Sequence, residues 1–167
     1  SWYPDGKRLL LEDRGHLSAL TIADGSLDPV LVTEFTEHSG QVSPDGRWLL
    51  VTVARTFDQT DLYLQDRVAE GPLSPAVRDL PHQFEGQLGY GALYIRSNIE
   101  GTNYGLYLAD PANPARDRWR TVVPPQADAV LEGVMLTRRT LALSYLERAS
   151  SKLFLADLDG SSRREVP

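Results

Sequence analysis

The chain has 167 residues and contains no cysteine. It therefore forms no disulfide, offers no thiolate to a metal ion and has no cysteine nucleophile. Long apolar runs are also missing, and no segment approaches the roughly 20 apolar residues that a membrane-spanning helix needs. These absences exclude thiol chemistry and a helical membrane span within the sequence.

Positive charge is in the minority. Lysine and arginine number 17 against 23 aspartates and glutamates, for a net charge of −6. An acidic chain is a poor partner for nucleic acid or for an anionic membrane, because both attract basic surfaces. The hydrophobic content of 41% is ordinary for a globular protein. We expect one domain over 1–167. The sequence does not decide between a cytoplasmic and a periplasmic location.

A short alternating motif recurs along the chain. It reads DLYLQD at 61–66, GLYLAD at 105–110 and KLFLAD at 152–157, with a fainter copy, ALTIAD, at 19–24. The first residues of the copies are Ala19, Asp61, Gly105 and Lys152, at steps of 42, 44 and 47 residues. Such a period suits the four-stranded blades of a propeller. Alternation with a period of two favours strands over the helix pairs of a solenoid, which share this spacing.

A turn signal precedes the first two copies. YPDGKRLLLED at 3–13 is echoed by SPDGRWLLVTV at 43–53. Proline presets an early turn position, aspartate bonds nearby backbone and glycine tolerates the closing conformation. Later copies have LGYGALYIRS at 88–97 and LTRRTLALSY at 136–145 in the equivalent place. The thirteen glycines and eleven prolines cut the chain into short pieces.

These patterns predict an all-β fold, a β-propeller segment of about four four-stranded antiparallel blades. The expected blades are 1–37, 38–82, 83–125 and 126–167. The expected strands are 39–43, 47–53, 61–66 and about 76–80; 86–90, 92–97, 105–110 and 119–123; and 130–136, 140–147, 152–157 and about 163–166. Only residues 1–3 remain of the first blade's first strand.

Leu106 and Leu153 are expected in the core, so that truncating either to alanine costs about 2–5 kcal/mol. An open arc of blades would expose apolar faces at both ends and favour self-association.

No residue is identified as catalytic, metal-binding or cofactor-binding. The Gly-x-Ser-x-Gly turn of a hydrolase nucleophile is absent, and its nearest approximation, DGSS at 159–162, is typical of a hairpin turn. The histidines His16, His38 and His82 lie at turns or strand edges, with no metal-ligand spacing between them. We expect His38 and His82 to be solvated loop residues.

The carboxylates have structural explanations. Asp5, Asp24, Asp45 and Asp159 precede glycine, as turn positions prefer. Asp66, Asp110 and Asp157 close the repeated motif, where we expect them to accept hydrogen bonds from backbone N–H groups of the next turn. A pair acting in acid–base catalysis would have to converge in one cleft.

Three further patterns have a functional and a structural interpretation. GQLGYG at 86–91 is glycine-rich but lacks the lysine and helix of a phosphate loop. RDRWR at 116–120 could contact nucleic acid, or could be a blade loop in which Trp119 packs while Arg118 and Arg120 face water. The aromatic residues Tyr63, Tyr107 and Phe154 share one position in the motif and could line a ligand site or pack between blades; we favour packing.

The most specific sequence pattern in the chain lies at 97–134, which reads SNIEGTNYGLYLADPANPARDRWRTVVPPQADAVLEGV. It resembles the propeller domain of the prolyl oligopeptidase family of serine peptidases. FEGQLGY at 84–90 and the stretch 42–66 fit the same family, and the resemblance covers about 40–167. The matching features are Asn103-Tyr104, the strand Leu106 to Asp110, Pro111 and Pro114, Trp119, Val122-Val123-Pro124 and Leu131-Glu132.

The resemblance implies a propeller that does no chemistry. Such a propeller has seven blades, so this chain would be slightly more than half of one. It caps a separate α/β-hydrolase domain that holds a Ser-Asp-His triad, and limits access to short peptides. On this interpretation the chain gates a peptidase and by itself hydrolyses nothing. The alternative is a stand-alone propeller that acts as a scaffold for protein partners. Residues 1–53 are compatible with it, because their Pro-Asp-Gly pattern is generic among propellers.

Overall fold

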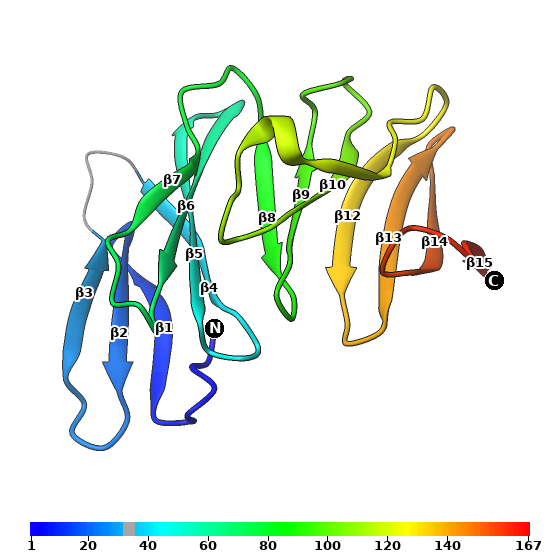
Figure 1. Ribbon diagram of the computed structural model, residues 1–167. Helices are drawn as coiled ribbons and strands as arrows, with labels where there is room; N and C mark the ends of the chain where they lie inside the picture. The colour runs from blue at the N-terminus through cyan, green and yellow to red at the C-terminus, as the bar shows by residue number, and fades with distance from the viewer. Residues whose placement is uncertain (32–35) are drawn as a thin grey trace.

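The computed structural model describes residues 1–31 and 36–167. The described residues form strands apart from turns and one short 3₁₀ helix, η1 (Arg116–Arg118). Four antiparallel sheets stand side by side (Figure 1). Sheet 1 contains β1 (Arg8–Asp13), β2 (His16–Thr21) and β3 (Leu27–Leu31); sheet 2 contains β4 (Thr36–Val42), β5 (Trp48–Thr56), β6 (Gln59–Asp66) and β7 (Ser74–Val77). Sheet 3 contains β8 (Phe84–Leu88), β9 (Leu93–Ser97), β10 (Gly105–Ala109) and β11 (Arg120–Val123); sheet 4 contains β12 (Val130–Leu136), β13 (Thr140–Glu147), β14 (Ser150–Asp157) and β15 (Arg164–Val166).

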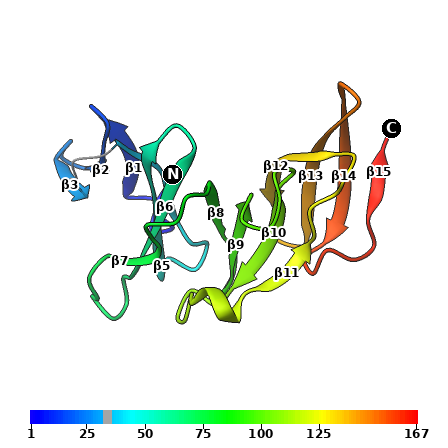
Figure 2. The same cartoon turned by 90° about the horizontal axis from the view of Figure 1, so that it is seen from above.

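Each sheet is a simple meander, in which every strand pairs with the next one along the chain. Seen from above, the sheets fan around an open arc (Figure 2). The strands β8 and β12 lie toward the concave side of this arc, and β11 and β15 lie away from it. Repeated meanders arranged radially are the architecture of a propeller. The predicted fold class is therefore confirmed.

The strands of sheets 2 to 4 agree with the prediction to within a few residues, and β12 and β13 have the expected bounds. Sheet 1 has three full strands. An isolated bridge between Trp2 and Leu9 places residues 1–3 beside β1, where the first strand of this sheet was expected. The predicted remnant of a fourth strand is therefore present as a single bridge.

The two Pro-Asp-Gly turns have the expected geometry. In the second turn the Gly46 N–H donates to Ser43 O at 2.8 Å, and the Arg47 N–H donates to Asp45 Oδ1 at 3.1 Å. Gly46 has a φ of +77°, a conformation that a side chain would strain. The first turn repeats the pattern, since Gly6 has a φ of +65°. These turns reverse the chain between the first and second strand of a blade.

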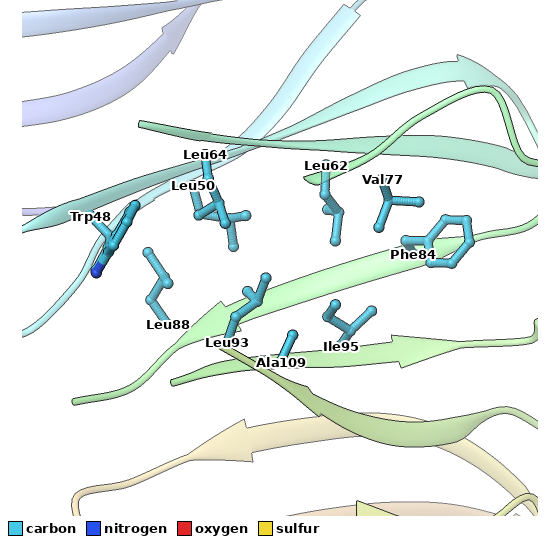
Figure 3. Close-up of a cluster of buried hydrophobic side chains, with 10 residues drawn as sticks. All are labelled: Trp48, Leu50, Leu62, Leu64, Val77, Phe84, Leu88, Leu93, Ile95 and Ala109. Carbon is cyan, nitrogen blue, oxygen red and sulfur yellow. The ribbon is translucent and has the colours of Figure 1, made fainter. Parts of the chain in front are cut away.

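The hydrophobic core lies between the sheets rather than within any one of them. Ten buried side chains fill the space between sheets 2 and 3 (Figure 3). Leu62 and Leu64 of β6 face sheet 3, whereas Tyr63 packs toward sheet 1, as the alternation predicted. Similar clusters fill the spaces between sheets 1 and 2 and between sheets 3 and 4. Each sheet therefore needs a neighbour to cover its apolar face.

The register expected for the faint copy ALTIAD is wrong. Leu10 and Leu50 follow the two Pro-Asp-Gly turns at the same distance, and they pair with Ala19 and Leu64 respectively. Ala19 is therefore the counterpart of Leu64 and not of Asp61. The aspartate of ALTIAD was matched to the wrong aspartate of the later copy. Asp24 accepts a hydrogen bond from the Ser26 N–H at 3.0 Å, and Asp159 accepts the same kind of bond from the Ser161 N–H at 2.9 Å. Asp24 therefore corresponds to Asp159 and not to Asp157.

One of the two expected core leucines is not in the core. Leu106 faces sheet 4 and is 1% exposed, whereas Leu153 is 43% exposed. Both occupy the same position of the motif, on the face that turns toward the next sheet. Sheet 4 has no described sheet beyond it, so Leu153 remains uncovered.

No helix among the described residues is long and apolar enough to cross a membrane.

Candidate functional site

His16 and His82, the two histidines whose side chains the structure describes, have different neighbours. His16 Nδ1 lies 2.7 Å from Glu37 Oε2, and this glutamate is fully buried between sheets 1 and 2. His82 is half-buried, against our expectation, and its ring meets the edge of Phe84 at a centroid distance of 6.4 Å. The side chain of His38 lies outside the described part of the chain. Within residues 1–31 and 36–167, no three histidine, aspartate or glutamate side chains are placed to hold a metal ion.

The aspartates before glycine act as turn residues. Asp5 accepts a hydrogen bond from the Lys7 N–H at 2.9 Å, and this bond lowers the pKa of Asp5. In the DGSS turn, hydrogen bonds from the Ser161 hydroxyl and N–H lower the pKa of Asp159. The ionised form of each carboxylate is therefore the one that the folded turn favours. The DGSS segment is a turn, as predicted.

The aspartates that close the motif behave as expected in two of three cases. Asp66 accepts from the N–H groups of Val68 and Ala69, and Asp110 accepts from that of Ala112. Asp157 is the exception, because its carboxylate accepts from the Ser161 hydroxyl at 3.4 Å. The Gly160 N–H, which matches the Ala69 N–H in the turn after Asp66, donates instead to the Asp157 backbone carbonyl at 2.9 Å.

Two carboxylates converge at the end of sheet 2. Asp61 is 3% exposed and accepts a hydrogen bond from the Asp79 N–H at 3.1 Å. Burial raises the pKa of Asp61. Arg55 forms an ion pair with Asp79 and lies 3.9 Å from Asp61 Oδ2. A cation bridges this pair, so its arrangement fits an ion-pair network better than an acid–base site.

The RDRWR segment is a packed loop. The Trp119 ring lies between Phe84 and Tyr107, at centroid distances of 6.2 and 5.9 Å. Its indole N–H donates to Pro114 O at 2.9 Å. Arg118 and Arg120 are exposed, as expected. Tyr107 is fully buried, and Tyr63 and Phe154 pack against the two other clusters, so these aromatic residues join sheets rather than line a ligand site.

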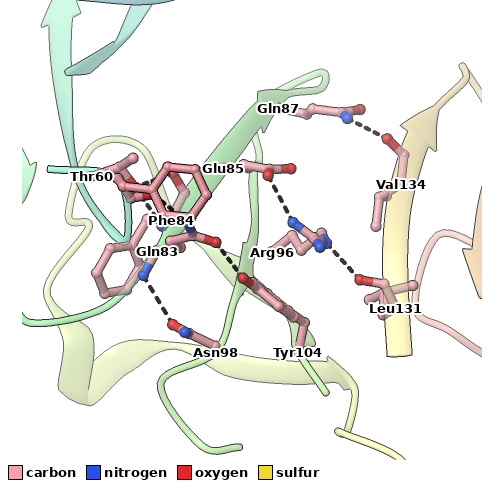
Figure 4. Close-up of polar contacts among 11 residues, drawn as sticks. Thr60, Gln83, Phe84, Glu85, Gln87, Arg96, Asn98, Tyr104, Leu131 and Val134 are labelled. Carbon is pink, nitrogen blue, oxygen red and sulfur yellow. Dashed lines mark hydrogen bonds and ion pairs between the residues drawn. The ribbon is translucent and has the colours of Figure 1, made fainter. Parts of the chain in front are cut away.

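The concave side of the arc has a polar lining that joins one sheet to the next. Gln41 Oε1 accepts a hydrogen bond from the Leu88 N–H at 2.7 Å, from strand β4 to strand β8. Gln87 repeats this contact one sheet later, accepting from the Leu136 N–H at 2.9 Å and donating to Val134 O (Figure 4). We call the first strands of sheets 2 to 4, namely β4, β8 and β12, the inner face.

Arg96 is the charged centre of the contact between sheets 3 and 4. Its side chain is 10% exposed, and its guanidinium donates to Leu131 O and to Glu85 Oε1, both at 2.7 Å (Figure 4). The same group lies 3.9 Å from the centre of the Tyr104 ring. Tyr104 in turn donates to Gln83 Oε1, which belongs to the turn before β8. Two nitrogens and one face of this cation are therefore in contact with neighbouring groups.

A hollow of about 320 Å³ opens on the inner face between β4 and β8. Its walls carry small or polar side chains: Ser39, Gly40, Gln41, Thr52, Glu85, Gly86 and Gln87. Amide, hydroxyl and carboxylate groups can exchange hydrogen bonds with a peptide backbone. Among the described residues that line the hollow, no serine or threonine hydroxyl is hydrogen-bonded to a basic side chain.

The inner face has a sequence signal of its own, which lies outside the repeated motif. The dipeptide Gly-Gln occurs at 40–41 and again at 86–87. At Gly86 a Cβ would come within 2.7 Å of Leu50 Cδ2, and a Cβ at Gly40 would crowd Leu10 of the preceding sheet in the same way. In β4 and β8, the glycine thus lets the strand approach the sheet before it, and the glutamine binds the sheet after it.

Comparison with known families and structures agrees with this architecture. The family model for the prolyl oligopeptidase N-terminal beta-propeller domain matches residues 29–167. The chain belongs to this family. The match includes all of sheets 2 to 4 and leaves β1 and β2 outside. It confirms the resemblance that the third blade carried.

Solved structures share the fold at low sequence identity. A prolyl endopeptidase structure is 23% identical with a TM-score of 0.83, over 99% of this chain and 27% of its own. Oligopeptidase B from Leishmania major is 17% identical with a TM-score of 0.78, over 99% of this chain and 26% of its own. A putative TolB from Agrobacterium tumefaciens is 20% identical with a TM-score of 0.71, over 100% of this chain and 60% of its own. The chain therefore spans about a quarter of the length of the peptidases it matches.

Proposed function

We propose that this prolyl oligopeptidase-family propeller segment forms part of the wall that limits access to a peptidase active site. Its partner is an α/β-hydrolase domain with a Ser-Asp-His triad, and the molecules that pass its inner face are short peptides. The observation that carries the proposal is the polar inner face, on which Gln41, Glu85 and Gln87 border a hollow of about 320 Å³. Solved peptidases with the same fold support the assignment.

A wall of this kind needs rigidity more than reactivity. The inner strands are joined by hydrogen bonds from Gln41 and Gln87 and by the buried Arg96, so adjacent sheets hold a fixed spacing. The Glu85 side chain is 60% exposed, so its carboxylate can accept and release hydrogen bonds from the backbone of a passing peptide. We therefore expect the chain to affect which peptides are cleaved and to take no part in bond cleavage.

The absence of chemistry is tested on the pure chain. The chain is incubated with a chromogenic proline-containing peptide and, separately, with a fluorophosphonate that labels activated serines. We expect neither hydrolysis nor labelling. Hydrolysis that persists after further purification and is abolished by the fluorophosphonate would overturn the non-catalytic role.

The access role is tested in the protein that joins this chain to its hydrolase domain. Ser39 lines the hollow and is exposed, so Ser39→Trp narrows the hollow without disturbing the core. We expect kcat/KM to fall more for an eight-residue peptide than for a dipeptide. An equal effect on both substrates would contradict the access role, as would the absence of a Gly-x-Ser-x-Gly turn from the hydrolase partner.

A further inference from the structure

A second cavity lies near the turns that join β4 to β5, β8 to β9 and β12 to β13. Figure 1 shows these turns at the opposite ends of the strands from the turns between β5 and β6 and between β9 and β10. It has a volume of about 290 Å³. It is lined by the turns between the first and second strands of sheets 2, 3 and 4, by the adjoining ends of β4, β8, β9 and β12, and by Leu158 of the turn between β14 and β15. The residues that matter for its chemistry are Gln41, Leu88, Tyr90, Leu136, Arg138 and Leu158. The proposed function assigns no role to this cavity.

The cavity carries one formal charge. Among the described residues that line it, Arg138 is the only charged one, and none is a carboxylate. Within the part of the chain that the structure describes, Arg138 forms no ion pair; its Nη2 donates to the Tyr90 hydroxyl at 3.2 Å. In a chain with a net charge of −6, an arginine without a carboxylate at the mouth of a cavity is a place where an anion is stabilised.

Tyr90 and Arg138 act on the same side of the cavity. The Tyr90 oxygen accepts the hydrogen bond from Arg138, so the O–H proton of Tyr90 is free to donate elsewhere. The guanidinium has five N–H donors and uses one of them here. The ring of Tyr90 lies 5.5 Å from the guanidinium carbon, which keeps the two groups together. Together they can hold both oxygens of a carboxylate.

The rest of the cavity suits a compact apolar group next to a carbonyl. Leu88 is 2% exposed and forms the floor with Leu136 and Leu158. Tyr94 fixes one wall, because its hydroxyl donates to Leu158 O at 3.1 Å. Gln41 uses its Oε1 to bind Leu88, and its NH₂ group has no hydrogen-bond partner within the described chain. That group can donate to a carbonyl oxygen.

We propose that this cavity binds the C-terminal residue of a short peptide that ends in an apolar side chain. The carboxylate lies against Arg138 and Tyr90, the side chain fills the space over Leu88, and Gln41 binds the preceding carbonyl. The inference does not depend on the proposed function, since the cavity is built from this chain's own turns.

The test uses the 167-residue chain and N-acetyl-leucine as the probe, with N-acetyl-leucinamide as its uncharged counterpart. Binding is followed by amide chemical shifts in NMR titrations. We expect a dissociation constant of about millimolar for a ligand of this size, with shifts confined to the turns around Tyr90 and Arg138. The amide should bind at least about tenfold more weakly, because it lacks the charge-assisted hydrogen bonds.

Two variants test whether Arg138 supplies the positive charge that binds the carboxylate of the probe. Arg138→Gln should weaken N-acetyl-leucine by about tenfold or more and remove its advantage over the amide. Arg139→Gln is the matched control, since Arg139 is also exposed but does not line the cavity, and it should leave binding unchanged. Thermal unfolding checks that both variants fold.

Any one of three results would overturn the proposal: no chemical-shift changes at a saturating concentration of the probe, equal affinities for N-acetyl-leucine and its amide, or equal effects of the two arginine substitutions. Hexanoate supplies the carboxylate and an apolar chain without the peptide carbonyl. If hexanoate binds as tightly as N-acetyl-leucine, the assignment to a peptide terminus is wrong.

Discussion

Gln41 and Gln87 occupy the same position in successive sheets, and each binds the backbone of the sheet that follows. Gln41 pairs with Leu50 across its own sheet, and Gln87 pairs with Tyr94. Gln41 reaches Leu88 of β8, and Gln87 reaches Val134 and Leu136 of β12. The third member of the series is Met135, which pairs with Ala142 and is 67% exposed. The amide thus appears where a following sheet is present to receive it.

Replacing Gln87 by leucine should destabilise the chain. The variant loses hydrogen bonds with Val134 O and the Leu136 N–H, and leaves backbone groups of β12 without a partner. We expect the free energy of unfolding to fall by about 1–3 kcal/mol. Urea denaturation measures the change. Met135→Leu is the control at the matching position of sheet 4, and it should alter stability by no more than about 0.5 kcal/mol.

Leu106→Ala and Leu153→Ala change the same position of the motif in different surroundings. Leu106 is buried between sheets 3 and 4, so its truncation should cost about 2–5 kcal/mol. Leu153 is 43% exposed, so its truncation should cost less than about 1 kcal/mol in the 167-residue chain. Denaturant midpoints of the two variants provide the comparison. Equal losses would show that a second copy, or some other partner, covers sheet 4 in solution.

Arg96→Met should show how much the stability of the contact between sheets 3 and 4 depends on this one cation. The substitution keeps much of the side-chain volume but leaves Leu131 O without its donor. We expect a loss of about 1–3 kcal/mol in the free energy of unfolding. Glu85→Gln tests the other partner of the ion pair. Because the Glu85 side chain is 60% exposed, its loss of charge should cost at most about 1 kcal/mol. A larger effect at Glu85 than at Arg96 would contradict this assignment.

Asp66→Asn should make the free energy of unfolding depend less on pH in the acid range. The hydrogen bond from Arg47 is the main cause that lowers the pKa of Asp66 below its ordinary 3.8. The stabilisation from Asp66 is therefore present above pH 3.8 and is lost as the pH falls through the lower value of the folded state. We expect the variant to have a lower urea midpoint than the parent at neutral pH, and the difference to shrink toward about pH 2.

Asp61→Asn should show the opposite dependence on pH. Burial raises the pKa of Asp61 above 3.8, so the folded state favours the protonated form. The contribution of Asp61 is fully present below 3.8 and declines as the pH rises through the folded-state value. Asparagine keeps an oxygen for the Asp79 N–H and carries no charge. The variant should gain stability relative to the parent as the pH rises. A relative gain in Asp66→Asn would contradict the first assignment, and a relative loss in Asp61→Asn would contradict the second.

Local chemistry in the sequence was enough to place most of the strands and turns. The alternation in DLYLQD fixed which side of β6 is apolar, because successive side chains of a strand point to opposite faces. The Pro-Asp-Gly turns fixed where β1 and β5 begin, because their hydrogen bonds join residues only a few positions apart. The register of ALTIAD was not recoverable in this way, since it depends on the pairing of Leu10 with Ala19 across the sheet.

Burial and the polar inner face were decided by the packing of one sheet on the next. Leu106 and Leu153 are the same residue in the same motif, and only the presence of a following sheet makes one of them core. Gln41 and Gln87 are ordinary polar residues in the sequence, and they become structural because neighbouring strands bring backbone groups within reach. The cavity beside Arg138 is likewise assembled from segments of three different sheets. The sequence by itself determined the strands, the turns and the family, because these depend on contacts close along the chain. Only the tertiary structure decided which faces are covered and where cavities form, because those depend on contacts between sheets.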